Sequence, residues 1–191
     1  LRMELVKRAL IALVVMFPVI WFFVLHSYQK MRILVLFNPS VDPYGSGYHV
    51  IQSKISIGSG GFLGQGLFEG TQSQLNFLPE NHTDFIFSVI GEELGFIGAI
   101  FVIFLYFVLL YRTIMISRSS GDSFGSLLAC GIFSMWLFQV FINVGMTLGI
   151  MPVTGIPLPF MSYGGSALVM NLLCVGILMN IYLRRKKLMF D

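Results

Sequence analysis

The sequence predicts an all-α polytopic membrane protein, and three observations lead to this fold class. The 191 residues are 56% hydrophobic and only 11% charged. Soluble domains average about 25% charged residues, so a soluble domain of this composition could not cover its surface with charge. Intrinsic disorder is excluded because disordered chains are poor in aromatic residues, which make up 15% of this chain. The apolar residues also gather in long runs, near or above the roughly 20 residues that an α-helix needs to cross a bilayer.

Four of these runs are predicted to be transmembrane helices. They cover about residues 9–25, 85–111, 124–150 and 162–183. The first is just long enough to span, although Pro18 interrupts it, and the other three exceed the roughly 20 residues required. Residues 26–84 are predicted to form a long outer loop, residues 151–161 a short outer loop, and residues 184–191 a basic cytoplasmic tail.

The long outer loop differs in composition from the rest of the chain, with many Gly residues and with apolar residues spaced between them. Loops of this length without regular structure are usually functional or disordered. The spaced apolar residues argue against disorder. We therefore expect this segment to lie on the membrane surface as short amphipathic pieces.

The positions of the basic residues predict how the helices are oriented, because short cytoplasmic loops are enriched in Lys and Arg. With the N-terminus inside, nine of the twelve Lys and Arg residues fall on the cytoplasmic side. These nine are Arg2, Lys7, Arg8, Arg112, Arg118, Arg184, Arg185, Lys186 and Lys187. The net charge of +3 is therefore a consequence of topology, and no nucleic-acid partner is expected.

A polar stretch at the entry to the second predicted helix brings Glu80, His82 and Asp84 together. A carboxylate at a membrane–water boundary can take a proton from a substrate hydroxyl, as a general base does. Asp84 and the adjacent Thr83 are also residue types that cap helix N-termini. The residues alone leave both roles open. The three histidines of the chain do not have the spacing of metal ligands, so no metal site is expected.

Glu92 and Glu93 lie inside the second predicted helix, roughly 12 Å or more beyond Asp84 at a rise of about 1.5 Å per residue. Carboxylates within a membrane usually face the bundle interior or a water-filled cavity, which favours a functional role. The alternative is a helix–helix hydrogen bond that fixes packing. Since the four runs contain no basic residue that could pair with these glutamates, we expect their partner on helices outside this chain.

The segment before the fourth predicted helix, residues 149–165, contains Pro152, Pro157 and Pro159 together with several Gly residues. Proline and glycine in this density forbid a regular helix, yet the residues between them are apolar. Non-helical backbone near membrane depth is tolerated only where it is buried in protein or lines a cavity. We interpret the segment as a cavity wall that opens outward, with a simple tight connection as the alternative.

Several long motifs occur in the order typical of one known family. They are Gly45–Lys54 (GSGYHVIQSK), Gly58–Gly61 (GSGG), Gly70–Gln74 (GTQSQ), Leu78–Phe87 (LPENHTDFIF), Gly91–Gly95 (GEELG) and Pro157–Gly165 (PLPFMSYGG). With these motifs the chain resembles the SEDS (shape, elongation, division and sporulation) family of bacterial cell-wall polymerases. The stretch that runs from Gly70 to Glu80 is more similar to the elongation branch of the family than to the division branch.

The resemblance implies a fold and an activity. Family members are about twice as long and have approximately ten transmembrane helices, so the chain is similar to the C-terminal half of a single SEDS membrane domain. The implied activity is a peptidoglycan glycosyltransferase that polymerises lipid II into glycan strands during cell elongation and rod-shape maintenance. The active site would face outside on the bacterial cytoplasmic (inner) membrane. This half alone is expected to be inactive, because part of the cavity wall would be missing.

The resemblance also implies roles for individual residues. Asp84 matches the carboxylate that the family needs for polymerisation, and it would act as the general base. The expected supporting residues are Glu80, His82, Thr83, Glu92 and Glu93. The expected substrate-binding residues are Lys54, Gln52, Ser53, Arg32, Pro159, Ser162, Tyr163, Gly164 and Gly165. Lys54, followed by Arg32 and Lys30, would offer positive charge to the leaving pyrophosphate, with a divalent cation such as Mg²⁺ as an alternative.

The implied partners are lipid II, the nascent glycan strand, a class B penicillin-binding transpeptidase and other membrane proteins of the elongation complex. Two other functions stay open on the sequence. One is a lipid II flippase or transporter, which the intramembrane Glu92 and Glu93 would serve. The other is a non-catalytic membrane scaffold for a transpeptidase. Polymerisation is favoured because the polar residues gather on one face, with no charged path across to the cytoplasmic side.

Overall fold

The computed structural model describes residues 25–75, 77, 80 and 82–184. The first predicted span, 9–25, and the basic tail, 184–191, therefore lie almost entirely outside the described residues. The chain forms two compact units, residues 1–48 and residues 49–191, and each is taken by itself. The described residues are helical or irregular, and no strand occurs among them, as the sequence predicted for an all-α protein.

The first unit contains α2 (Ser27–Phe37), the short 3₁₀ helix η2 (Pro39–Val41) and the start of α3 (Ser46–Ser59). Local side chains set these boundaries. The Asn38 side chain accepts a hydrogen bond from the backbone N–H of Ser40 at 3.1 Å and so caps η2. The carboxylate of Asp42 accepts from the backbone N–H of Ser46 at 2.8 Å and starts α3. Residues predicted as an outer loop thus form short helical pieces.

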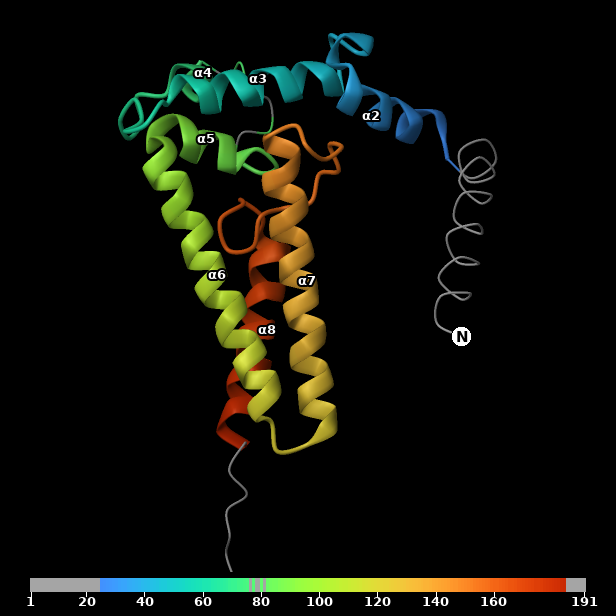
Figure 1. Ribbon diagram of the computed structural model, residues 1–191, viewed down its shortest axis with the longest axis vertical. Helices are drawn as coiled ribbons and strands as arrows, with labels where there is room; N and C mark the ends of the chain where they lie inside the picture. The colour runs from blue at the N-terminus through green and yellow to red at the C-terminus, as the bar shows by residue number, and fades with distance from the viewer. Residues whose placement is uncertain (1–24, 76, 78–79, 81, 185–191) are drawn as a thin grey trace, which may run out of the picture. The chain divides into compact units, whose positions relative to one another are not determined.

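In the second unit, α3 from His49 onward crosses the ends of two long helices and packs on α5 (Ile86–Glu93) (Figure 1). Two buried serines make this contact. The Ser53 hydroxyl lies 2.6 Å from the Ser88 hydroxyl and donates to the backbone carbonyl of Thr147 at 2.7 Å. The Ser56 hydroxyl donates to Glu92 at 2.8 Å. These bonds hold α3 across the bundle end.

The second predicted helix, 85–111, is wrong in its boundaries. It is divided into α5 and α6 (Gly95–Ser119). Gly95 has a φ of +67°, a left-handed conformation that glycine adopts without steric cost. The backbone N–H groups of Phe96 and Ile97 donate to the carbonyls of Gly61 and Phe62, at 2.9 and 3.3 Å. The preceding loop thus satisfies the first donors of α6.

The same helix also continues beyond its predicted end at Tyr111. Its last turns include Arg112 and Arg118, both exposed. Long basic side chains can extend their charge to water while their stems lie on apolar surface, so they do not end a membrane helix. The helix was predicted to end at Tyr111 because the charged Arg112 follows, and this predicted end was too early.

The other two long helices are α7 (Ser123–Thr147) and α8 (Gly165–Arg184). Their predicted ranges, 124–150 and 162–183, differ from these by three residues or fewer at each end. The carboxylate of Asp122 caps α7 by accepting from the backbone N–H of Gly125 at 3.0 Å. A helix of 25 residues and one of 20 residues are both long enough to cross a bilayer of about 30 Å.

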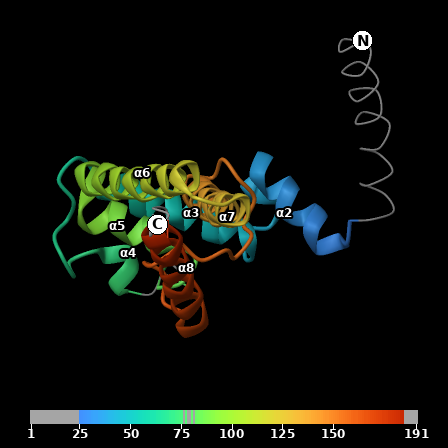
Figure 2. The same ribbon diagram turned by 90° about the horizontal axis from the view of Figure 1, so that it is seen from below.

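The three long helices form one bundle, in which α6 and α7 are antiparallel and α8 packs against both (Figures 1 and 2). Between α7 and α8 the fully buried Trp136 donates from its indole N–H to the Asn171 side chain at 2.8 Å. All three helices are long and apolar enough to span a membrane. Their outward faces expose large apolar side chains such as Phe101, Phe104 and Phe107, and the chain is a membrane protein.

Candidate functional site

The segment before α5 is a tight turn centred on Glu80. Glu80 has a φ of +55°, and its backbone carbonyl accepts from the N–H groups of Thr83, Asp84 and Phe85 at 3.2 to 3.3 Å. The Thr83 hydroxyl donates to the Glu80 carboxylate at 2.9 Å. Glu80 and Thr83, two of the predicted supporting residues, therefore shape the turn that carries Asp84.

Asp84 is half-buried and lies one residue before the N-cap of α5. The cap position belongs to Phe85, which makes no side-chain cap hydrogen bond. Asp84, which the sequence offered as a possible helix cap, thus stands one residue outside the cap position of α5. His82 is exposed beside it, and the His49 ring stacks on Phe85 with 5.9 Å between ring centres.

The Pro- and Gly-rich segment before α8 joins this turn. The Ser162 hydroxyl donates to the backbone carbonyl of Thr83 at 2.6 Å, and the backbone N–H of Tyr163 donates to the carbonyl of His82 at 2.9 Å. Gly155 lies near the Asp84 carboxylate, since a Cβ atom built at this position would lie 3.2 Å from Oδ2. The structure thus brings together two motifs that are more than 70 residues apart in sequence.

The same segment folds into the bundle. The Tyr106 hydroxyl donates to the backbone carbonyl of Pro159 at 2.6 Å, and Phe160 packs edge-on against Trp136 with 5.5 Å between ring centres. Tyr106 lies about 17 Å along α6 from its start, at about 1.5 Å per residue. A simple tight connection would not reach this depth, and the segment is a non-helical piece of chain that packs inside the bundle.

The predicted substrate-binding residues of this segment therefore differ in what they can do. The Ser162 hydroxyl also accepts from the backbone N–H of Leu158 at 2.7 Å, and the Pro159 carbonyl is bonded to Tyr106. Both serve the protein's own structure. Tyr163 is 82% exposed, and Gly165 is exposed beside it at the start of α8, next to the half-buried Gly164. These three are the accessible members of the group.

One residue of the site was not among the predicted ones. Asn143, on α7, is fully buried, and its side-chain Nδ2 donates to the backbone carbonyls of Asp84 at 2.9 Å and Ile156 at 2.8 Å. It is one of the few polar residues in an apolar run. That polarity was the signal that could have identified it.

Glu92 is fully buried, but its surroundings differ from the prediction. Its carboxylate accepts from the Ser56 hydroxyl at 2.8 Å and from the backbone N–H groups of Gln72 at 2.7 Å and Ser73 at 3.1 Å. These amides form the start of α4 (Thr71–Gln74). The expectation of a partner on helices outside this chain was therefore wrong for Glu92, because the segment before α5 supplies three donors.

The half-buried Glu93 ends α5, and its backbone carbonyl accepts from the N–H of Gly66 at 3.1 Å. Both glutamates precede α6, the helix that is long enough to span. The prediction that they lie within a spanning helix was therefore wrong. It failed because the apolar residues on either side of Gly95 were taken as one helix, although the backbone breaks there.

The predicted cation residues fall in both units. In the second unit, Lys54 is exposed on α3, and the end of its side chain lies against Gly149, just beyond the end of α7. Its neighbour Gln52 is half-buried, and Ser53 is buried in its bonds to α5 and α7. In the first unit, Lys30 and Arg32 lie on α2, with the Arg32 guanidinium 5.9 Å from the centre of the Tyr28 ring.

No group of three or more His, Cys, Asp or Glu side chains that could hold a metal ion occurs in the part of the chain that the structure describes.

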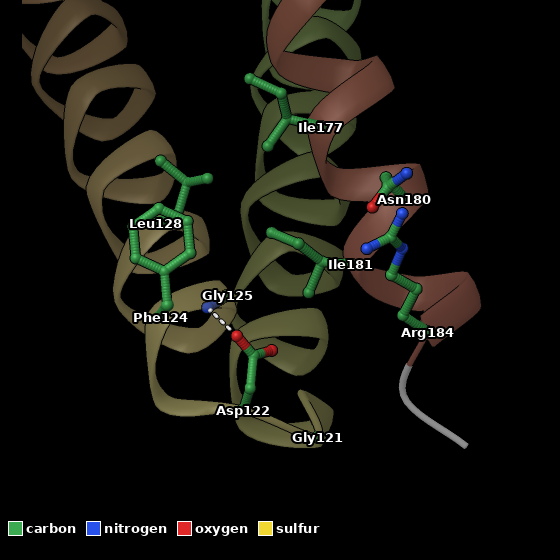
Figure 3. A pocket seen from close by; sticks show the side chains of 9 residues that line it. All are labelled: Gly121, Asp122, Phe124, Gly125, Leu128, Ile177, Asn180, Ile181 and Arg184. Atoms are coloured by element: carbon green, nitrogen blue, oxygen red, sulfur yellow. Dashed lines mark hydrogen bonds between the residues drawn. The ribbon is translucent and has the colours of Figure 1, made fainter. Parts of the chain in front are cut away.

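A separate pocket of about 450 Å³ lies between α7 and α8 at their other ends (Figure 3). Phe124 and Leu128 line it from α7, and Ile177 and Ile181 from α8. Position 124 is 19 residues before Asn143, or about 28 Å along the helix. This pocket is thus distinct from the site around Asp84.

The described part of the chain is thus a membrane helix bundle in which a non-helical segment folds inward and hydrogen-bonds to the turn that carries Asp84. Comparison with known proteins identifies the family. A family model for FtsW, RodA and SpoVE, described as "Cell cycle protein", matches residues 2–187. The chain belongs to this family, which confirms the resemblance that the motifs indicated.

Individual relatives agree with this assignment. The chain is 47% identical over 188 residues to peptidoglycan glycosyltransferase MrdB of Escherichia coli K12, covering 98% of this chain and 51% of MrdB. It is 49% identical over 162 residues to peptidoglycan glycosyltransferase RodA of Treponema pallidum, covering 85% and 37%. Stage V sporulation protein E of Bacillus subtilis is 49% identical over 154 residues, covering 81% and 42%. The chain thus spans about half the length of such relatives.

A solved structure supports the fold. One chain from a study of how a peptidoglycan synthase complex coordinates polymerization and crosslinking matches with a TM-score of 0.75 and 32% identity. The match covers 97% of this chain and 50% of that chain.

Proposed function

We propose that the full-length protein is a peptidoglycan glycosyltransferase that polymerises lipid II into glycan strands during cell elongation and rod-shape maintenance. Relatives that share 47% and 49% identity with the chain are named peptidoglycan glycosyltransferases. The observation that carries the proposal is the setting of Asp84. Its backbone carbonyl accepts a hydrogen bond from Asn143 on α7, its carboxylate lies near Gly155 of the inward-folded segment, and the residue is half-buried.

In the proposed reaction, Asp84 accepts the proton from the 4-hydroxyl of the acceptor's terminal GlcNAc. The hydroxyl oxygen forms a bond to the anomeric carbon of the donor MurNAc as the bond to undecaprenyl pyrophosphate breaks. The configuration at that carbon inverts, and the leaving pyrophosphate carries away the bonding electrons. A positioned general base contributes about 10² to 10⁴ in rate.

Lys54 is proposed to stabilise the leaving pyrophosphate, and its substitution tests this. Lys54→Ala is expected to lower turnover about tenfold or more, because charge that develops in a transition state is stabilised by a fixed cation. The measurement is the rate of glycan polymerisation by the full-length protein in liposomes. Arg118→Ala removes an exposed cation from the far end of α6 and serves as control. Unchanged turnover in Lys54→Ala would show that Lys54 does not stabilise the pyrophosphate and only packs at the end of α7.

We further propose that the protein lies in the bacterial inner membrane with Asp84 facing outside, and that it works with a class B penicillin-binding transpeptidase. The positions of the basic residues support the orientation. The matched chain from a synthase complex that couples polymerization and crosslinking supports the partner. Other membrane proteins of the elongation complex are proposed to bind the assembly of this protein and the transpeptidase.

The flippase alternative drew its support from Glu92 and Glu93 as carboxylates on a path across the membrane. The Glu92 carboxylate is instead occupied by three donors from the segment before α5. The burial of this carboxyl group therefore has a structural explanation, and polymerisation is the function that the geometry supports better.

The deciding experiment supplies fluorescent lipid II to the full-length protein in liposomes. Glycan strands are the expected product, visible as a ladder on a gel. Lipid II that lacks the 4-hydroxyl on its GlcNAc is the matched control, because it cannot act as acceptor. Movement of lipid II between leaflets without strand formation would contradict the proposal and favour a transporter.

A further inference from the structure

Asn143 connects α7 to two loop segments. It is one turn from the end of α7, and the side chain is fully buried, with 0% of its surface exposed. Its single Nδ2 atom donates to two backbone carbonyls, that of Asp84 at 2.9 Å and that of Ile156 at 2.8 Å. Both N–H groups of the amide therefore bridge two segments that are distant in sequence.

The two bridged segments are the two that meet around the Asp84 carboxylate. Ile156 directly follows Gly155, which has a φ of +73° and lies near the Asp84 carboxylate, since a Cβ atom built there would lie 3.2 Å from Oδ2. One carboxamide thus holds the backbone carbonyl of the proposed base and that of Ile156, the residue that follows Gly155. A shift at Asn143 would change the position of both relative to α7.

The other atom of the amide argues against a purely stabilising role. Asn143 Oδ1 is buried and has no hydrogen-bond donor among the described residues. A buried acceptor without a partner lowers stability, because it loses its hydrogen bonds to water on folding. An apolar side chain of similar volume would avoid this loss, but it could not form the bridge.

We propose that Asn143 is a positioning residue for the transfer reaction, which holds Asp84 and Gly155 in register through the Nδ2 bridge. This inference rests on the proposed function. It differs from a general packing role, because a positioning residue affects turnover more than it affects substrate affinity or folding. Misplacement of a catalytic group by about 1 Å can cost about a hundredfold in rate.

The test compares Asn143→Leu with Gln139→Leu in the full-length protein. Gln139 lies one turn earlier on α7 and also has a buried side-chain oxygen without a donor among the described residues. Both substitutions remove a polar side chain from the same helix, but only Asn143→Leu removes the bridge. We expect kcat to fall at least tenfold in Asn143→Leu with the KM for lipid II within twofold. Gln139→Leu should retain kcat within twofold.

Hydrogen exchange provides a second readout that does not depend on activity. In Asn143→Leu the peptide that contains residues 82–88 should exchange faster, while peptides from α6 and α8 should exchange as in the unchanged protein. Asn143→Gln keeps the amide but lengthens the side chain. Asn143→Gln replaces Asn143→Leu in the test if the latter fails to fold. It should show an intermediate fall in kcat with KM unchanged.

Asp84→Asn, measured alongside, separates the two hypotheses. If Asp84→Asn is inactive while Asn143→Leu keeps its kcat, the positioning role is overturned and the proposed function stands. If Asn143→Leu raises KM and speeds exchange throughout the bundle, Asn143 is only structural and the inference is also overturned. Full activity in Asp84→Asn would overturn the proposed base, and the positioning role with it.

Discussion

Asp84→Asn is expected to lower the rate of glycan polymerisation by about a hundredfold or more, the contribution typical of a positioned general base. The amide has the size of the carboxylate but cannot accept the proton from the attacking hydroxyl. The contacts of the backbone carbonyl with Asn143 do not involve the substituted atoms, so the turn should persist. The measurement is strand formation by the full-length protein in liposomes with lipid II.

Asp122→Asn is a matched control for this substitution. Asp122 caps α7 at the opposite end of the bundle, and Asn is about as good an N-cap as Asp. Both variants lose one carboxylate, and only Asp84→Asn should lose activity. Wild-type turnover in Asp84→Asn would sink the general-base hypothesis, and equal losses in both variants would indicate a general effect of charge.

The sequence was sufficient to predict the long helices because each apolar run is close to the length that a bilayer requires. It was not sufficient to predict the break at Gly95. The break depends on loop carbonyls, those of Gly61 and Phe62, that satisfy the first N–H groups of α6. Such a contact between separate segments leaves no trace in hydropathy, so α5 and α6 were predicted as one helix.

The candidate site, like the helices, could be predicted from the sequence only in part. The motifs marked Asp84 and the segment with Ser162, but their meeting depends on hydrogen bonds between residues about 79 positions apart. Ser162 was predicted to bind substrate, and in the structure its hydroxyl bonds to two backbone groups. Asn143 was not predicted as a site residue because a single amide in an apolar helix can equally serve helix packing. Only its distances to Asp84 and Ile156 identify its role.

Glu92→Ala is expected to have the largest effect on stability. The substitution would leave the Ser56 hydroxyl and two backbone N–H groups, those of Gln72 and Ser73, without their acceptor. A buried donor without a partner costs about 1–3 kcal/mol, so the three together should unfold the contact between α4 and α5. The measurements are the thermal midpoint of the full-length protein in detergent and limited proteolysis of residues 60–75.

Glu93→Ala is the matched control, since the neighbouring carboxylate is only half-buried and its backbone carbonyl, which the substitution keeps, makes the contact with Gly66. We expect a lower midpoint and faster cleavage in Glu92→Ala, with Glu93→Ala close to the unchanged protein. Glu92→Gln should fall between them, because a carboxamide oxygen can still accept from one backbone N–H, whereas its NH₂ group would face another donor. If Glu92→Ala were as stable as Glu93→Ala and instead abolished movement of lipid II across the membrane, the buried carboxylate would serve transport rather than structure.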